Sequence, residues 1–391
     1  MKIDDKTSHN SPSIRFPEFT GEWKKCVLGD YGKVVTGNTP PTKDIENYEN
    51  GTYLWASPAD LGTHKLISET KTKLSSKGFT KTRPLSKGSV LVTCIGSTIG
   101  KTGMATREMS TNQQINSIVV NENNDNEFVY YVVQSAFPHY LSSIAVQAVP
   151  IISKSSFELL PSKRPSLQEQ NKIGKFLSLL DERISTQHRL IEDLKKFKCA
   201  IVEKLYSEIQ GKEYSYRQLF EIINERNSRL EYSNVLSASQ EKGMVNREDL
   251  NLDIKFELSN INTYKIVREG DYVIHLRSFQ GGFAFSNMVG VCSPAYTIMR
   301  PKKLLEYGYL SYYFTSRKFI KSLIIVTYGI RDGRSINVDE WLDMKNIIPS
   351  KEQQQHILRT IKGFENKIEV EEMYASYLSK QKQYLLRQMF I

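Results

Sequence analysis

A segment of 42 residues occurs twice in this chain of 391 residues, and it constrains the fold more than any other feature of the sequence. The first copy begins at Pro165, the second begins at Pro349, and the two align without a gap. Both copies open with Pro-Ser and a turn rich in Gln and Glu, which is typical of a helix start. The repeat therefore predicts a tandem duplication, in which a variable globular unit precedes each of two long helices.

Apolar residues in both copies recur at spacings of four and three over more than four heptads, which indicates a coiled-coil seam rather than an ordinary surface helix. The interruptions of this pattern also match, because Gln187 corresponds to Glu371 and Lys198 corresponds to Lys382. Two unrelated amphipathic helices would not share such defects. We therefore predict two antiparallel helices, related by an internal pseudo-two-fold axis, that pair through Ile173, Leu177, Leu180, Ile184, Leu194, Ile357, Ile361, Phe364, Ile368 and Leu378.

The segments outside the helices also correspond, although more loosely. Residues 85–103 resemble residues 267–285, and residues 152–166 resemble residues 336–350. Strand-like and helix-like runs mix in both segments, so we predict an α+β fold in which two α/β-mixed domains are separated by the two long helices. The predicted boundaries are a tail at 1–20, a first domain at 21–164, a helix at 165–208, a second domain at 209–348 and a helix at 349–391.

The net charge of the chain is +10 and its pI is about 9.1, which suggests a polyanionic partner. The excess of basic residues is spread thinly, and a solvated surface explains most of it. Two local basic runs are more informative, because lysine and arginine side chains can position a protein on DNA through phosphate contacts. We predict such contacts from Lys71, Lys73, Lys77, Lys81, Arg83, Lys302 and Lys303.

Several other classes of protein are disfavoured by the composition. No apolar run approaches the roughly 18 residues that span a bilayer, and the polar N-terminus lacks the apolar core of a signal peptide, so we expect a cytoplasmic protein. The four cysteines and six histidines are dispersed along the chain, in spacings that predict neither a disulfide framework nor a metal site.

The stretch Gly96–Thr102 resembles a phosphate-binding loop, which would make the chain a nucleotide-hydrolysing enzyme. That motif needs four residues between its glycines and a following helix, whereas Gly96 and Gly100 enclose only three residues. The residues that follow read as strand, so no helix N-terminus is available to hold a phosphate. The corresponding loop of the second unit also lacks the Lys and the Thr. We therefore favour a recognition loop, with a plain surface hairpin as the alternative.

The whole arrangement resembles the specificity subunit of type I restriction–modification systems. The residues that carry the resemblance are 15–40, the loop "IGSTIGKTG", the segment "TNQQINSIVV", Pro-Ser before each long helix, and residues 328–350. The resemblance implies that the two domains are target-recognition domains, each for one half of a bipartite double-stranded DNA site. It further implies that the paired helices set the spacing and dock two methyltransferase subunits, which endonuclease/translocase subunits join.

The resemblance also implies that this chain has no catalysis and no cofactor of its own. S-adenosylmethionine, ATP and Mg would bind to the partner subunits. The sequence agrees, because its one Pro-Pro pair, Pro40-Pro41, is preceded by Thr39 instead of Asn, Asp or Ser and is followed by Thr42 instead of the aromatic residue that an adenine methyltransferase places beside a flipped base. A coiled-coil scaffold whose globular units bind proteins remains the alternative function.

Side chains able to contact bases or phosphates occur in the loops of both domains. Amides suit adenine, and arginines suit guanine or phosphate. The candidates are Ser97, Thr98, Lys101, Asn112, Gln113, Gln114 and Asn116 in the first domain, and Arg277, Ser278, Gln280, Arg331 and Arg334 in the second. Alternatively, Asn112 and Asn116 cap turns and the two last arginines pair with nearby acids. We expect Tyr48, Tyr53 and Trp55 to pack in the core or in loops.

Overall fold

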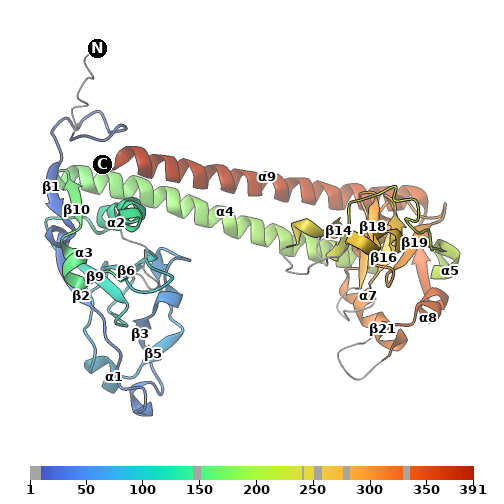
Figure 1. Ribbon diagram of the computed structural model, residues 1–391, viewed down its shortest axis with the longest axis horizontal. Coiled ribbons are helices and arrows are strands. Elements are labelled where there is room, and N and C mark those ends of the chain that lie inside the picture. Colours follow the sequence, from blue (N-terminus) through green and yellow to red (C-terminus); the bar gives the residue numbers. More distant parts are fainter. Residues whose placement is uncertain (1–9, 144–150, 240–241, 251–257, 276–281, 329–334) are drawn as a thin grey trace. The chain divides into compact units, whose positions relative to one another are not determined.

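The computed structural model describes residues 10–143, 151–239, 242–250, 258–275, 282–328 and 335–391. The chain divides into two compact units. Unit 1 comprises residues 1–188 together with 374–391, and unit 2 comprises residues 189–373. Each unit therefore contains a sheet-rich domain and one half of each long helix (Figure 1).

The centre of unit 1 is a five-stranded sheet in the order β2-β9-β6-β7-β4. Its first four strands are antiparallel, and β4 joins β7 in parallel. All four residues of β6 are buried, as its apolar run predicts for a central strand. The strands are β2 (Gly32–Thr36), β4 (Leu66–Ile67), β6 (Val90–Thr93), β7 (Thr102–Ala105) and β9 (Ile115–Val120).

Shorter elements complete unit 1. Helix α2 (Asn126–Ser143) packs against β6 and β7, and β1 (Lys24–Val27) pairs antiparallel with β10 (Pro161–Arg164). A second sheet has the order β5-β3-β8, in which β3 is parallel to β8. The remaining bounds are β3 (Tyr53–Ala56), β5 (Thr72–Leu74), β8 (Ser110–Thr111), α1 (Ser76–Thr80), α3 (Lys154–Glu158) and the short 3-10 helices at Leu28–Tyr31, Ile45–Asn47 and Pro58–Asp60.

Unit 2 repeats this topology. Its four-stranded antiparallel sheet has the order β12-β19-β16-β17, which corresponds to β2-β9-β6-β7 of unit 1. The pair β11–β22 corresponds in the same way to β1–β10. The bounds are β11 (Lys212–Ser215), β12 (Phe220–Ile223), β16 (Tyr272–Ile274), β17 (Phe283–Phe285), β19 (Thr297–Pro301) and β22 (Lys345–Ile348).

The core of unit 2 is rich in aromatic side chains. Trp341 is fully buried and stacks on Tyr216, with ring centroids 4.2 Å apart. The smaller elements around this core are β13 (Leu236–Ser239), β14 (Gly243–Asn246), β15 (Lys265–Val267), β18 (Gly290–Cys292), β20 (Thr327–Tyr328), β21 (Ser335–Ile336), α5 (Tyr216–Leu219), α6 (Tyr309–Tyr313), α7 (Arg317–Ser322), α8 (Val338–Asp343) and 3-10 helices at Arg247–Asp249, Leu258–Thr263 and Leu323–Val326.

The duplication extends to individual backbone contacts. Gly88 and Gly270 both adopt a positive φ, +82° and +89°, in the turn that leads into the central strand. The N–H of Gly88 donates to the Ala105 carbonyl at 2.8 Å, and the N–H of Gly270 donates to the Ser286 carbonyl at 2.8 Å. The resemblance between residues 85–103 and 267–285 thus corresponds to one structural motif present twice.

The two long helices are α4 (Leu167–Ser207) and α9 (Lys351–Met389). In unit 1 the first half of α4 meets the last half of α9, and in unit 2 the last half of α4 meets the first half of α9. In unit 2, Lys195 pairs with Glu372 and Lys198 pairs with Glu365, so the partner numbers fall as the α4 numbers rise. The helices are therefore antiparallel, and the predicted fold class is confirmed. All ten predicted pairing residues are buried or half-buried.

The charged interruptions of the seam form reciprocal ion pairs. In unit 1, Asp181 lies 2.6 Å from Lys382, and in unit 2, Glu365 lies 3.3 Å from Lys198. Asp181 and Glu365 occupy equivalent positions of the repeat, as do Lys198 and Lys382. A tyrosine from the domain also donates to each carboxylate, Tyr131 to Asp181 at 2.6 Å and Tyr312 to Glu365 at 2.8 Å. The ion pairs therefore join the two helices, and the tyrosine hydrogen bonds join each domain to a helix.

A double-mutant cycle should measure this contribution. The side chains of Asp181 and Lys382 are 19% and 15% exposed, so solvent screens their pair only partly. We expect a coupling free energy of about 1–2 kcal/mol between Asp181→Ala and Lys382→Ala in urea unfolding. The control is the pair Asp193–Lys196 on α4, whose side chains are 74% and 75% exposed and should couple by less than about 0.5 kcal/mol. Equal coupling in the two cycles would contradict the assignment.

The segment before β1 is packed against unit 1. Of the 20 residues predicted as a tail, the structure describes residues 10–20. The N–H of Ile14 donates to the Gln388 carbonyl at 3.0 Å, and the rings of Phe16 and Phe176 lie edge to face at 5.8 Å. Apolar and charged side chains in this segment thus contact both long helices. Among the described residues, no helix is both long and apolar enough to cross a membrane.

Candidate nucleic-acid interface

Loops that are distant in the sequence meet at one end of the sheets of unit 1. Strands β6 and β9 are antiparallel, with Thr93 opposite Ile115, so the loop after β6 lies beside the loop before β9. The residues after β2 join them, since the N–H of Asn38 donates to the Thr111 carbonyl at 2.9 Å. The N–H of Asn112 donates to the Ala56 carbonyl at 2.9 Å, which brings in the residues after β3. We call residues 37–42, 57–62, 94–101 and 112–114 the loop cluster.

The loop at 94–101 is the turn of a β-hairpin. It joins β6 to β7, and the N–H of Gly100 donates to the Thr93 carbonyl at 2.9 Å. Because a strand follows this loop, no helix N-terminus is present to hold a phosphate, and residues 96–102 do not form a nucleotide site. Ser97 and Lys101 are exposed on the turn, and Thr98 is half-buried.

The predicted amide residues separate into two kinds. Asn112 is buried, its Nδ2 donates to Gln114 Oε1 at 3.1 Å, and its Oδ1 accepts from the Gln114 N–H at 3.0 Å. Asn116 is also buried, and its Oδ1 accepts from Thr36 Oγ1 at 2.6 Å. The bonds of Asn112 shape the turn, as the alternative interpretation predicted for this residue. Asn116 instead lies in β9, and its bond joins β9 to β2, so it does not cap a turn. Gln113 is the exposed amide of the segment.

The basic residues predicted to contact phosphate differ in their surroundings. Lys71 is exposed, and its N–H donates to Asp60 Oδ1 at 2.8 Å, so it lies beside the loop cluster. Arg83 Nη1 donates to the Thr36 carbonyl at 2.7 Å, which places it there as well. Lys73, Lys77 and Lys81 instead form ion pairs with Glu69, Asp44 and Glu46. The hydrogen bond from Lys81 lowers the pKa of Asp44.

Lys302 and Lys303 do not lie with the corresponding loops of unit 2. They follow β19, whereas the residues equivalent to 112–114 precede it. A five-residue strand separates the two positions by about 17 Å. Lys302 Nζ donates to the Arg217 carbonyl at 3.0 Å.

Sequence reasoning missed the segment Gly37–Pro41 as part of the candidate site. Trp55 Nε1 donates to the Asn38 carbonyl at 3.1 Å, and the Tyr48 hydroxyl donates to the Pro40 carbonyl at 2.7 Å. Burial raises the pKa of Tyr48, which therefore remains a donor at neutral pH. Tyr48 and Trp55 thus pack and fix a loop, as predicted. The sequence feature that could have identified this segment is the run Gly-Asn-Thr-Pro-Pro, which is typical of a turn and comes directly after a strand.

Unit 2 has equivalent loops after β12 and before β19. Arg226 and Arg229 are exposed in the first, and Lys265 Nζ donates to the carbonyl of Tyr296 in the second at 2.7 Å. The ring of His275 lies 6.0 Å from that of Tyr296, and burial lowers the pKa of His275. The predicted residues Arg277, Ser278, Gln280, Arg331 and Arg334 lie outside the described residues.

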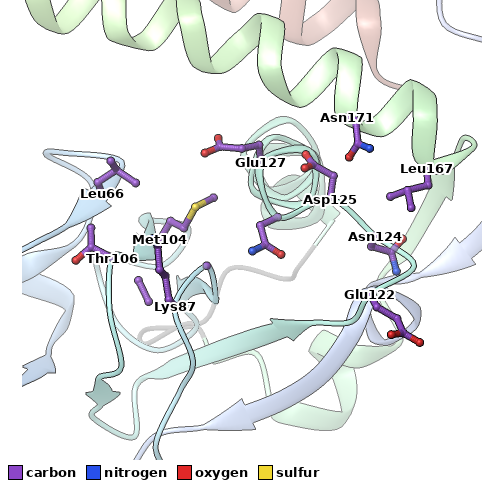
Figure 2. A pocket seen from close by; sticks show the side chains of 13 residues that line it. Leu66, Lys87, Met104, Thr106, Glu122, Asn124, Asp125, Glu127, Leu167 and Asn171 are labelled. Carbon is purple, nitrogen blue, oxygen red and sulfur yellow. The ribbon is translucent and has the colours of Figure 1, made fainter.

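The opposite end of the unit 1 sheet contains a pocket instead of a cluster of exposed loops. A pocket of about 830 Å³ lies there, between the Gly88 turn, the start of α2 and the first turns of α4. Figure 2 shows Asp125 and Glu127 on the helix side, with Asn171 and Leu167 of α4 beside them and Leu66 and Met104 across the pocket. Its lining has three carboxylates, from Glu122, Asp125 and Glu127, and one lysine, Lys87, and Glu127 forms an ion pair with Lys65. We call it the acidic pocket. Its lining has no excess of positive charge to attract phosphate, so this end is less suited to DNA than the loop cluster.

The chain is similar to proteins of one known family. Residues 20–196 match the family described as type I restriction modification DNA specificity domain. The MjaVIII type I restriction enzyme specificity subunit of Methanocaldococcus jannaschii is 23% identical, over 95% of this chain and 92% of that subunit. The MjaIX specificity subunit of the same organism is 27% identical, over 48% of this chain and 45% of that subunit.

A solved structure has the same fold. It belongs to a study titled as the structural basis of complex assembly and conformational transition of the type I R-M system. Its chain superposes with a TM-score of 0.62 at 14% identity, covering 93% of this chain and 96% of that chain. The fold and the matched family define a non-catalytic DNA-specificity protein. Residues 20–196 thus carry the type I restriction–modification DNA specificity domain, and nearly the whole chain is similar to a specificity subunit of these systems.

Proposed function

We propose that this subunit recognises a bipartite DNA site, one half through the loop cluster of unit 1 and the other through the equivalent loops of unit 2. The observation that carries the proposal is the convergence of four loops at one end of the unit 1 sheets, where Lys71, Lys101 and Gln113 are exposed. The acidic pocket occupies the other end. The repeated sheet topology supports the same use of unit 2.

We further propose that the paired helices dock two methyltransferase subunits. Large apolar side chains remain exposed on the helices of each unit, and a protein partner that covers them would bury apolar surface. In unit 1 these include Leu179, Tyr377 and Tyr384, and in unit 2 they include Leu190, Val370 and Met373. Endonuclease/translocase subunits would join this complex, which would act on cytoplasmic DNA. The partners would bind S-adenosylmethionine, ATP and Mg.

Methylome sequencing of cells with and without this chain tests the proposal. We expect one bipartite motif, methylated on adenine in each strand, that appears only when the chain and its methyltransferase are both present. A purified complex with the methyltransferase that binds every DNA sequence equally would instead favour the scaffold alternative.

A charge substitution in the loop cluster gives a quantitative prediction. Lys101 is exposed and has no ion pair within the described residues, so its charge is available to a phosphate. Lys101→Ala in the assembled complex should reduce the magnitude of the slope of log K against log salt by about 0.9, without changing the methylated motif. The matched control is Lys73→Ala, because Lys73 is already paired with Glu69 at 2.6 Å. An unchanged salt slope for Lys101→Ala would remove this residue from the interface.

A further inference from the structure

One side chain of the loop cluster is held in a defined orientation by a residue from another loop. Gln113 is exposed, and its Oε1 accepts a hydrogen bond from the Thr39 hydroxyl at 2.5 Å. The two residues are 74 positions apart in the sequence. The amide group of Gln113 makes no further hydrogen bond within the described residues, so its two N–H groups are available to an external acceptor.

Thr39 itself has little freedom to move. The carbonyl of the preceding residue, Asn38, accepts from Trp55 Nε1, and the carbonyl of the following residue, Pro40, accepts from the Tyr48 hydroxyl. The Asn38 side chain also donates to the Lys81 carbonyl at 2.8 Å. A residue before proline is further restricted to extended conformations. The hydroxyl of Thr39 therefore has a fixed position from which to orient Gln113.

This orientation has a chemical consequence. A free glutamine amide rotates and can offer either an acceptor or donors, whereas an amide whose oxygen is engaged offers donors. In the major groove, guanine, adenine and thymine present acceptors, and cytosine presents an amino donor. We propose that Thr39 is a positioning residue that fixes Gln113 as a donor, so that unit 1 selects a base with an acceptor and rejects cytosine at one position. This inference rests on the proposed function and specifies how the loop cluster discriminates.

Three substitutions in the complex with methyltransferase test the role of Thr39. Thr39→Val removes the hydroxyl and keeps the shape, Thr39→Ser restores the hydroxyl, and Thr52→Val is a matched control on an exposed threonine of unit 1 outside the loop cluster. Competition binding with duplexes that carry each base in turn at each half-site position measures the discrimination. We expect Thr39→Val to reduce the preference against cytosine about tenfold at one position, and we expect Thr39→Ser and Thr52→Val to keep the wild-type preference.

Two further measurements separate orientation from general damage. Gln113→Glu replaces the donors by an oxygen on an exposed side chain, and it should weaken binding to the recognised site by at least about tenfold. For wild type, replacing one purine of the site by its 7-deaza analogue should weaken binding at a single position, and Gln113→Ala should remove that sensitivity. If Gln113 donates to guanine O6 or thymine O4 instead of a purine N7, binding should weaken when that base is replaced by cytosine, and Gln113→Ala should remove this effect.

The outcomes distinguish this inference from the proposed function. A wild-type complex with no sequence preference would overturn the proposed function and this inference together. A wild-type preference that Thr39→Val retains in full at every position would overturn the role of Thr39 alone. Full binding by Gln113→Glu would exclude Gln113 as the selecting donor.

Discussion

Arg15→Ala is expected to lower the free energy of unfolding by about 3–5 kcal/mol, because it leaves a buried carboxylate without its counter-charge. Glu169 is only 1% exposed. Arg15 Nε and Nη2 each donate to one of its oxygens at 2.7 Å, and Trp23 Nε1 donates to Oε1 at 3.2 Å. The same pairing raises the pKa of Arg15, which therefore stays charged. Urea unfolding followed by tryptophan fluorescence measures the loss.

The second copy of the repeat suggests the control for this prediction. The position equivalent to Glu169 is Gln353, which is neutral and exposed. Adding Glu169→Gln to Arg15→Ala should therefore recover most of the lost free energy, because a neutral amide needs no counter-charge. A loss below about 1 kcal/mol for Arg15→Ala, or no recovery in the double variant, would show that the pair does not stabilise unit 1 in this way.

Gly174→Ala on α4 is expected to destabilise the protein by about 1–3 kcal/mol, although Gly→Ala in a helix is normally stabilising. A Cβ at this position would lie 2.3 Å from Asp125 Oδ1 and 2.9 Å from the Phe128 backbone nitrogen. The start of α2 packs directly against the helix at this point, so the backbone of α2 would have to shift. Overpacking therefore outweighs the gain in helix propensity.

Gly363→Ala on α9 is the matched substitution with the opposite expected sign. A Cβ there meets nothing within 4 Å, so only the helix propensity changes. We expect a gain of about 0.5–1 kcal/mol. Denaturant unfolding of both variants under one set of conditions measures the contrast. Effects of the same sign would contradict the close packing of α2 on α4.

Much of the architecture was predictable because it depends on local periodicity. The heptad spacing identified both long helices, and the duplication, in which each globular unit precedes its own helix, indicated their antiparallel pairing. The three residues between Gly96 and Gly100, with a strand predicted after them, disfavoured a phosphate loop, and the hairpin between β6 and β7 agrees with that prediction. The predicted turn-capping alternative holds for Asn112, because it follows from a preference of asparagine that acts over a few residues, whereas Asn116 bonds to Thr36 across two strands.

The candidate site was less predictable because its contacts join distant residues. Lys77 and Lys81 appeared free along the sequence, but the fold pairs them with acids more than thirty positions away. Lys302 and Lys303 are adjacent to a strand end that faces away from the loops. No local signal connects Thr39 to Gln113, since their contact exists only after β2 and β9 pair.

By itself the sequence determined the duplication, the two long helices and their antiparallel seam. The helices follow from periodic burial along each helix, and their direction follows from the repeat, in which each globular unit precedes its own helix. The tertiary structure decided which lysines keep an unpaired charge, which amide of residues 112–114 remains exposed, and which end of the sheet bears the acidic pocket. Those properties depend on strand pairing and on side chains brought together across the fold, and short-range patterns carry no information about such distances.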